Sequence, residues 1–242
     1  LKYYLKFITK AVLFVYRPTV IAVSGSINKS FFKNEIKRVL QSEGIVTRSN
    51  EKSFNTEIGL PLAILDLGSG YNSFKKWLSV MQDALTSIFK NRLSGVLVLE
   101  LGVSRPGDMR YLLSLVRPKI SVITDITQRY LESFSDMDDL SQEYEFLAKN
   151  TAKDGLVILN HDNIRLRGMA KKTRTKVETF GFSEGSDWRI SEIKRKSDGQ
   201  LFKIKHKDLE KEYAIERFGQ HHVLARTVGE IIKDNFRIIN NK

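Results

Sequence analysis

Short apolar runs alternate with segments of helical periodicity along most of the chain. The apolar runs are nearly continuous, as in parallel strands that are covered on both faces. They occupy residues 20–23, 44–47, 95–102, 120–124 and 155–160, and the more polar segment 176–182 is predicted as a further strand. Between them, apolar residues recur every three or four positions, as in helices with one buried face. The alternation predicts an α/β fold with a mostly parallel sheet that is flanked by helices.

Helices are predicted wherever the three-to-four-residue spacing persists. They cover residues 31–40, 57–67, 74–92, 109–116, 135–149, 164–172 and 219–234. The helix over residues 74–92 has a long apolar face, formed by Phe74, Trp77, Leu78, Met81, Leu85, Ile88 and Phe89. Later segments instead alternate apolar and polar residues, at 188–196, 201–207 and 213–218. With a hairpin turn at residues 197–200, they predict a small antiparallel β appendage near the C-terminus.

Residues 1–18 are predicted to form a basic amphipathic helix. Residues 1–17 contain four basic side chains and no acidic one. Their longest uncharged run, residues 11–16, is far too short to span a bilayer, and Pro18 ends the helix. Two placements are open. The helix could lie on an anionic membrane, or it could pack on the following domain or on one outside the chain.

Composition limits the classes of function. The 242 residues suffice for one large α/β domain or two small ones. The chain has no cysteine, which excludes disulfides and thiolate metal sites. The net charge of +12 favours polyanionic partners, although a general role in solubility explains it equally well. Nucleic acid is not an expected partner, because basic clusters such as residues 171–174 lack the interleaved aromatic residues of single-strand binders.

The segment after the first strand has the layout of a phosphate-binding loop. A turn over residues 24–30 contains Gly25 and ends in Lys29 and Ser30, directly before a helix. Such a turn directs backbone N–H groups and a helix N-terminus at an anion. Lys29 would neutralise the outer phosphates, and the hydroxyl of Ser30 would hold magnesium. The alternative is an ordinary strand-turn-helix with a solvated lysine.

Asn28 and Glu100 also bear on this site. Asn28 occupies the place of a second loop glycine that commonly needs positive φ, and asparagine tolerates this geometry better than most residues. Glu100 stands near the carboxyl end of the strand over residues 95–102. Ligands of open α/β sheets bind beyond this end, so Glu100 is a candidate magnesium ligand. The alternative is a glutamate that caps a loop.

Five segments, in this order, resemble the central ATP-binding domain of the Mur ligases, which build the peptide of bacterial peptidoglycan. They read VSGSINKSFFKNEI, SFNTEIGLPLAIL, VLELGVSRPGDMRYLLSLVRPKISVITDI, GLVILNHDN with VETFGF, and FGQHHVLA. The resemblance places a P-loop domain of this family at residues 19–236. It also implies that the amino- and carboxyl-terminal domains of the family are absent from this chain.

The resemblance implies an ATP-dependent ligase of peptidoglycan precursor synthesis, which forms an amide bond through an acyl phosphate. ATP and Mg²⁺ would be its cofactors. Its partners would be a UDP-muramoyl-peptide, an amino acid or dipeptide, and a chain that supplies the missing domains. Its location would be cytoplasmic, with residues 1–17 available for contact with the inner face of the membrane.

The resemblance also implies roles for individual residues. Lys29 and Glu100 would be catalytic, Ser30 and Glu100 would bind the metal, and Asn55 falls in the substrate-side segment. The implied ATP contacts are Gly25, Ser26, Asn28, Lys29, Ser30, Asn160 and His222.

Four further positions depart from the family pattern. Phe31 replaces a threonine, and Tyr130 stands where the family has a metal-side histidine. Tyr144 aligns with a lysine, carbamylated in relatives, that supports a second magnesium. His222 replaces an asparagine beside the adenine. The alternative is therefore a degenerate ATP-binding or scaffold relative without catalytic activity.

Overall fold

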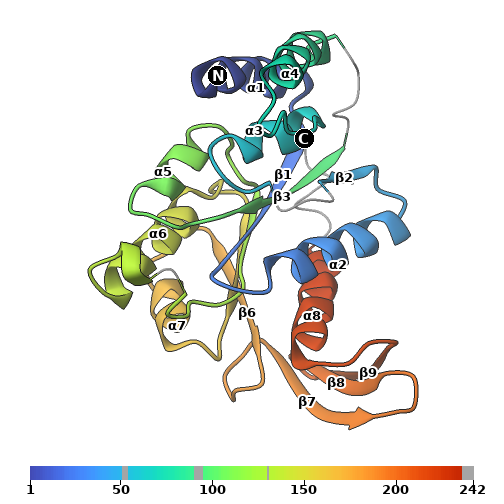
Figure 1. Cartoon of the computed structure of the whole chain (residues 1–242). Helices are drawn as coiled ribbons and strands as arrows, with labels where there is room; N and C mark the ends of the chain where they lie inside the picture. The colour runs from blue at the N-terminus through green and yellow to red at the C-terminus, as the bar shows by residue number, and fades with distance from the viewer. Residues whose placement is uncertain (51–53, 90–94, 130, 236–242) are drawn as a thin grey trace.

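The computed structural model describes the chain except for residues 51–53, 90–94, 130 and 236–242. Within the described part, nine strands form one sheet in the order β2-β3-β1-β4-β5-β6-β7-β8-β9 (Figure 1). The strands are β1 (Thr19–Ser24), β2 (Thr47–Ser49), β3 (Val96–Leu101), β4 (Ile120–Ile123), β5 (Leu156–Asn160), β6 (Lys176–Gly181), β7 (Trp188–Arg195), β8 (Gln200–His206) and β9 (Leu209–Ile215). β1 pairs in parallel with β3 on one side and β4 on the other. The mostly parallel sheet expected from the sequence is confirmed.

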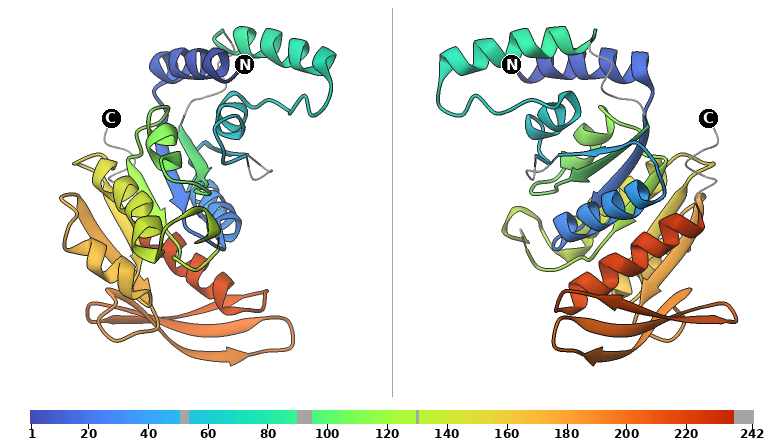
Figure 2. Two further views of the ribbon diagram at one scale, coloured as in Figure 1. Left: turned by 60° about the vertical axis from the view of Figure 1, so that its left-hand side comes forward. Right: turned by 90° about the vertical axis from the view of Figure 1, so that its right-hand side faces the viewer.

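Helices cover both faces of the sheet (Figure 2). They are α1 (Lys2–Tyr16), α2 (Lys29–Ser42), α3 (Gly59–Leu65), α4 (Phe74–Ser87), α5 (Asp108–Leu113), α6 (Met137–Asn150), α7 (Ile164–Ala170) and α8 (Gln220–Asp234), with a short 3-10 turn at Leu131–Ser133. α2 and α8 pack with Ile21 and Val23 of β1 in one core. The other α helices pack with Val20 and Ala22 in a second core. Successive side chains of β1 thus enter opposite cores, which explains the continuous apolar run in the sequence.

The predicted antiparallel appendage is also confirmed. β7 pairs with β8, and β8 with β9, in antiparallel register. The appendage does not form a separate sheet, because Phe180 and Gly181 of β6 pair in parallel with Trp188 and Arg189 of β7. It therefore extends the main sheet at the edge farthest from β2.

α1 and α4 lie side by side at the end of the molecule opposite β7–β9 (Figures 1 and 2). The hydroxyl of Tyr4 donates to the carbonyl of Met81, and that of Tyr16 to the carbonyl of Ile88, each at 2.8 Å. Since one face of α1 is buried in the core of the domain, packing on the following domain is confirmed for this helix. No helix in the described ranges is long and apolar enough to cross a membrane.

Some predicted boundaries were wrong. The strand expected at residues 44–47 begins only at Thr47, because the N–H groups of Gly44 and Ile45 donate to Gln41 and Leu40 and so close the end of α2. The helix expected at residues 57–67 shortens to α3. The helix expected at 74–92 is α4, which ends at Ser87, and residues 90–92 lie outside the described part.

Candidate functional site

The predicted phosphate loop lies at the carboxyl edge of the parallel strands. The loop follows β1, Glu100 lies near the end of β3, Thr124 follows β4, and Asn160 ends β5. These strands are neighbours in parallel register, so their carboxyl ends meet at one edge. This is the edge at which open α/β sheets bind ligands.

The loop is fastened to the end of β4 and requires glycine at position 25. The N–H of Ser26 donates to the carbonyl of Asp125 at 2.8 Å, and the hydroxyl of Thr124 donates to the carbonyl of Ile27 at 2.7 Å. Gly25 has φ +134°, and a Cβ at this position would lie 2.1 Å from Oγ1 of Thr124. No other residue fits here without moving the loop from β4.

Asn28 supplies the backbone geometry that the second loop glycine commonly provides. Its φ and ψ are 65° and 2°, in the left-handed region that asparagine was expected to tolerate. α2 begins at the next residue, and the side chain of Asn28 does not cap it. The helix N-terminus therefore remains available to an anion, favoured by the helix dipole.

Lys29 is folded back onto this loop. Its Nζ donates to the carbonyl of Gly25 at 2.7 Å. Burial lowers the pKa of Lys29; Glu100 acts to raise that pKa, and the positive charge of Arg129 adds to the lowering. A phosphate group would replace the Gly25 carbonyl as the partner of this ammonium group and would favour its charged form.

Glu100 is held in a buried ion pair that the sequence reasoning missed. Nζ of Lys33 lies 2.9 Å from Oε1 of Glu100, and both side chains are almost completely buried. Lys33 also donates to the carbonyl of Asn50 at 2.5 Å. The sequence contained a signal that Lys33 is buried. Lys33 is four residues after Lys29 and three before the buried Ile36, which places it on the apolar face of α2.

The donor set fits a magnesium ion that arrives with a phosphate. Apart from its ion pair with Lys33, Oε1 of Glu100 accepts no hydrogen bond within the described part of the chain. Ser30 lies in the first turn of α2, next to Lys29. The described residues contain no group of three histidine or carboxylate side chains that could hold a metal alone. Mg²⁺ typically takes one or two protein ligands plus phosphate oxygens and water, which Glu100 and Ser30 can provide.

Asn160 and Asn55 lie at this edge but differ in how they are used. The amide of Asn160 is buried; it donates to the carbonyl of Thr124 and accepts from the N–H of Asp162, both at 3.0 Å. Its observed contacts support the β4–β5 edge, and an ATP contact remains a prediction. The side-chain carboxamide of Asn55 lies against Gly102, directly after β3, and the backbone carbonyl of Asn55 accepts from the Gly102 N–H at 2.9 Å. Asn55 thus reaches the same edge from the substrate-side segment.

Tyr144 lies beneath the phosphate loop. It is fully buried on α6, and its hydroxyl is 3.4 Å from Oγ of Ser26. Ser26 Oγ also accepts from the N–H of Thr127 at 3.1 Å. The phenol of Tyr144 therefore occupies this side of the loop. Tyr130, the other departure expected on the metal side, lies outside the described residues.

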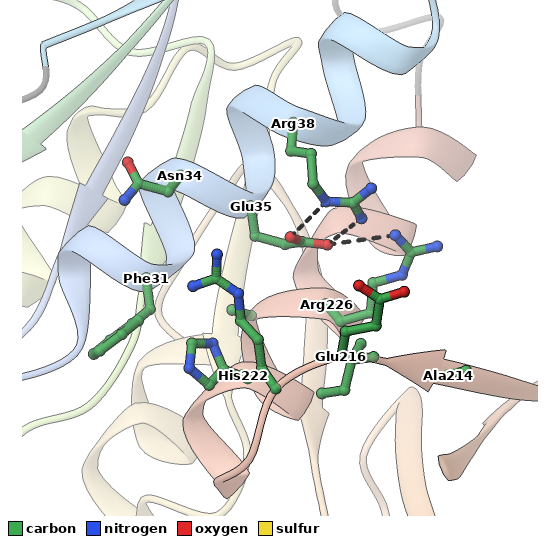
Figure 3. Close-up of a pocket in the computed structure, with 11 residues that line it drawn as sticks. Phe31, Asn34, Glu35, Arg38, Ala214, Glu216, His222 and Arg226 are labelled. Carbon is green, nitrogen blue, oxygen red and sulfur yellow. Dashed lines mark hydrogen bonds and ion pairs between the residues drawn. The ribbon is translucent and has the colours of Figure 1, made fainter. Parts of the chain in front are cut away.

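A cavity of about 520 Å³ lies beside the start of α2 (Figure 3). Its lining comes from α2, the end of β9 and α8, and includes Phe31, His222, Glu35, Arg38 and Arg226. The Phe31 ring lies 4.3 Å from the ring of His221 and 4.9 Å from that of His222, between centroids. Phe31, which follows the Lys29–Ser30 pair, therefore joins the phosphate loop to this cavity.

The cavity wall holds a cluster of opposite charges. Glu35 accepts two hydrogen bonds from Arg38, at 2.8 and 2.5 Å, and one from Arg226 at 3.4 Å (Figure 3). Burial acts to raise the pKa of Glu35, but these arginines outweigh it and the pKa is lowered. Burial lowers the pKa of His222, with His221 and Arg217 acting in the same direction and Glu35 opposing them. A neutral His222 can donate and accept hydrogen bonds at the edge of a purine base.

Residues 80–225 match the Mur ligase middle domain. The chain is 26% identical over 206 residues to UDP-N-acetylmuramoyl-tripeptide–D-alanyl-D-alanine ligase of Buchnera aphidicola, covering 85% of this chain and 40% of that protein. It is 25% identical over 216 residues to UDP-N-acetylmuramate–L-alanine ligase of Carboxydothermus hydrogenoformans, covering 89% and 40%. The chain therefore spans about 40% of the length of these two relatives.

Solved structures share the fold. The MurF ligase from Thermotoga maritima in complex with ADP superposes with a TM-score of 0.76 at 19% identity, covering 98% of this chain and 52% of that one. MurF from Acinetobacter baumannii gives a TM-score of 0.74 at 16% identity, covering 98% and 49%.

Proposed function

The chain belongs to the Mur ligase family, and on this premise we propose that it is the ATP-binding core of a peptidoglycan-precursor ligase. The observation that carries the proposal is that Lys29 and Glu100 lie together at one edge of the sheet. They lie beside a loop whose conformation requires glycine at position 25. ATP and Mg²⁺ are the cofactors of this proposal, and the Thermotoga relative was solved with ADP.

The nucleotide would extend from the loop into the cavity beside Phe31. The backbone N–H groups of the loop and the α2 N-terminus would bind the phosphates. Lys29 would turn from the Gly25 carbonyl to the outer phosphate, while Lys33 keeps the carboxylate of Glu100 in place. The base would meet Phe31 and His222, at the rim of the cavity.

The reaction would be amide formation in two steps. The carboxylate of one substrate attacks the γ-phosphorus of ATP, ADP leaves, and an acyl phosphate forms. The amine of the second substrate then displaces phosphate. The chain's own contribution to the first step is positioning and the positive charge of Lys29. Mg²⁺, held by Glu100 and the hydroxyl of Ser30, would polarise the transferred phosphoryl group.

The acid substrate would approach from the side of Asn55. A cavity of about 270 Å³ opens there, lined by Thr56, Gly102, Arg105 and Tyr111 among others. The names of the two curated relatives specify muramoyl precursors that receive D-alanyl-D-alanine or L-alanine. We propose the same classes of substrate for this protein, a UDP-muramoyl-peptide and an amino acid or dipeptide. We also propose a cytoplasmic location. Domains outside this chain, on the same protein or on a partner chain, would complete both substrate sites.

An ADP-release assay tests the catalytic proposal. The protein is incubated with MgATP and a UDP-muramoyl-tripeptide, with and without D-alanyl-D-alanine. The ligase proposal predicts ADP release that depends on the dipeptide. Lys29→Ala should abolish this release, whereas Lys37→Ala on the same helix should preserve it.

One alternative has specific support. Tyr144 and His222 replace groups that the family pattern uses for the second metal and the base, which favours an ATP-binding relative without ligase activity. This reading predicts that MgATP binds and that no added amine accelerates ADP release.

A further inference from the structure

α1 and α4 lie together at one end of the molecule (Figures 1 and 2). They and the residues at their ends expose large apolar side chains to water. Their exposed fractions are Tyr3 81%, Phe7 70%, Phe14 72%, Phe74 78%, Leu78 47%, Leu85 51% and Phe89 84%. Single exposed apolar residues are ordinary on protein surfaces. A concentration of them on two neighbouring helices indicates an interaction surface. These seven residues, with Lys10 and Arg17, are called the two-helix surface.

On α1 the exposed residues form one regular stripe. Tyr3, Phe7, Lys10 and Phe14 follow one another at intervals of four, three and four, which places them on one side of the helix. Arg17, directly after the helix, lies over the ring of Phe14. The opposite side buries Leu5, Ile8, Thr9 and Val12. The exposed stripe of α1 is therefore aromatic and basic, and its side chains do not contribute to the core of the domain.

On α4 the fold leaves part of the apolar face unused. The helix buries only Val80, Ala84 and Ser87, whereas Phe74, Leu78 and Leu85 face water at helical spacing. The long apolar face read from the sequence is thus mostly not the buried one. Apolar helix surface that the domain itself does not bury is available to contact a membrane or another protein.

The charges at this end identify the partner. Lys2 and Lys6 are used within the domain, because Lys2 pairs with Glu57 and Lys6 donates to Oγ of Ser114 at 2.6 Å. Lys10 and Arg17 are exposed beside the aromatic residues, and residues 1–17 contain no carboxylate side chain. Aromatic rings at headgroup depth, with lysine and arginine beside them, are the chemistry of helices that lie on anionic bilayers. A second copy of the chain would instead bring like charges together.

We propose that the two-helix surface docks on an anionic lipid bilayer, with α1 and α4 lying at the level of the headgroups. The contact is superficial, because neither helix is long and apolar enough to span the bilayer. It is independent of the proposed ATP site, which lies at the carboxyl edge of the sheet. Docking in this way would hold a soluble catalytic domain beside the membrane.

Co-sedimentation with lipid vesicles tests this proposal. The wild-type protein should bind vesicles of equal parts phosphatidylglycerol and phosphatidylcholine, and bind phosphatidylcholine alone at least about tenfold more weakly. The double variant Phe7→Ser, Phe14→Ser should lower the partition coefficient by about tenfold or more, since two rings no longer enter the interface. Leu209→Ser, an exposed apolar residue of β9, is the matched control and should have no effect.

Two double variants that remove the same charge separate the contribution of the two-helix surface to vesicle binding from that of the overall charge of +12. Lys10→Gln with Arg17→Gln should lower binding to the anionic vesicles by about tenfold. Lys205→Gln with Lys211→Gln removes the same charge from exposed positions on β8 and β9 and should change it less than about twofold. All substituted side chains are exposed, and circular dichroism should show unchanged folding.

Three results would overturn the proposal. The first is no binding of the wild type to anionic vesicles. The second is an equal loss in both charge-neutralised pairs, which would reduce the effect to net charge. The third is a concentration-dependent dimer that Phe7→Ser, Phe14→Ser abolishes while vesicle binding is unchanged, since a second copy would then occupy the surface.

Discussion

At the scale of single residues, the candidate site depends on the buried pair of Lys33 and Glu100. Two charges out of water are tolerated only when each has a partner. Here the partners are each other, at 2.9 Å, and the Asn50 carbonyl. The ion pair holds the carboxylate of Glu100 in place beside the phosphate loop. Lys33 is thus a positioning residue for Glu100, while Lys29 remains directed at the loop.

Removing Lys33 alone should destabilise the fold. Lys33→Met leaves Glu100 buried without its countercharge and should lower the free energy of unfolding by about 3–5 kcal/mol. The double variant Lys33→Met, Glu100→Gln removes both charges and should recover much of this loss. Urea denaturation of the three proteins measures the differences. A loss well under about 1 kcal/mol in the single variant, or a double variant no more stable than it, would contradict the account.

At the scale of elements, the unit that matters is β1, the loop and the start of α2. Its strand, turn and helix were predictable because each depends on neighbours in the sequence: an apolar run, Gly25, and helical spacing from Phe32 to Leu40. The position of Lys33 on the apolar face of α2 was visible in the sequence, but its pairing with Glu100 was not predictable. The pair requires α2 to pack against β3, which is distant in the sequence. The cavity was missed for the same reason, since it joins α2 to the end of β9 and to α8.

The apolar face of α4 shows a different limit of sequence patterns. Periodicity identifies an amphipathic helix, but it cannot say which of two adjacent apolar stripes is buried. Small side chains decided the outcome, because Ala84 and Ser87 allow close approach where Leu85 and Phe89 would not.

Substituting Gly25 should disable the loop as a unit. Gly25→Ala places a methyl group 2.1 Å from Oγ1 of Thr124 and also imposes positive φ on alanine. Loss of the loop from β4 should abolish binding of MgATP and lower the free energy of unfolding by about 1–3 kcal/mol. Gly107→Ala is a matched control, because Gly107 has φ +88° with open space around its Cβ position. Full nucleotide affinity in Gly25→Ala would show that the loop geometry described here is not required.

At the scale of the whole molecule, basic side chains lie in two separate regions. Lys29, Lys33 and Arg129 gather near the phosphate loop. Lys10 and Arg17 lie on the two-helix surface. The net charge of +12 predicted polyanionic partners in general. The two proposed sites for such partners are separate in the fold, with the nucleotide site at one edge of the sheet and the lipid-binding surface at one end of the molecule. The family resemblance read from five ordered segments is confirmed by the match to the Mur ligase middle domain.

Calorimetric titration of MgATP into the wild-type chain, Lys29→Ala and Lys37→Ala tests whether this loop is the ATP site. We expect saturable binding by the wild type and by Lys37→Ala, which alters the same helix away from the loop. Binding should be lost in Lys29→Ala, because the outer phosphates then meet no ammonium group. Equal affinity in Lys29→Ala, or no binding by the wild type, would contradict the assignment of this loop as the ATP site.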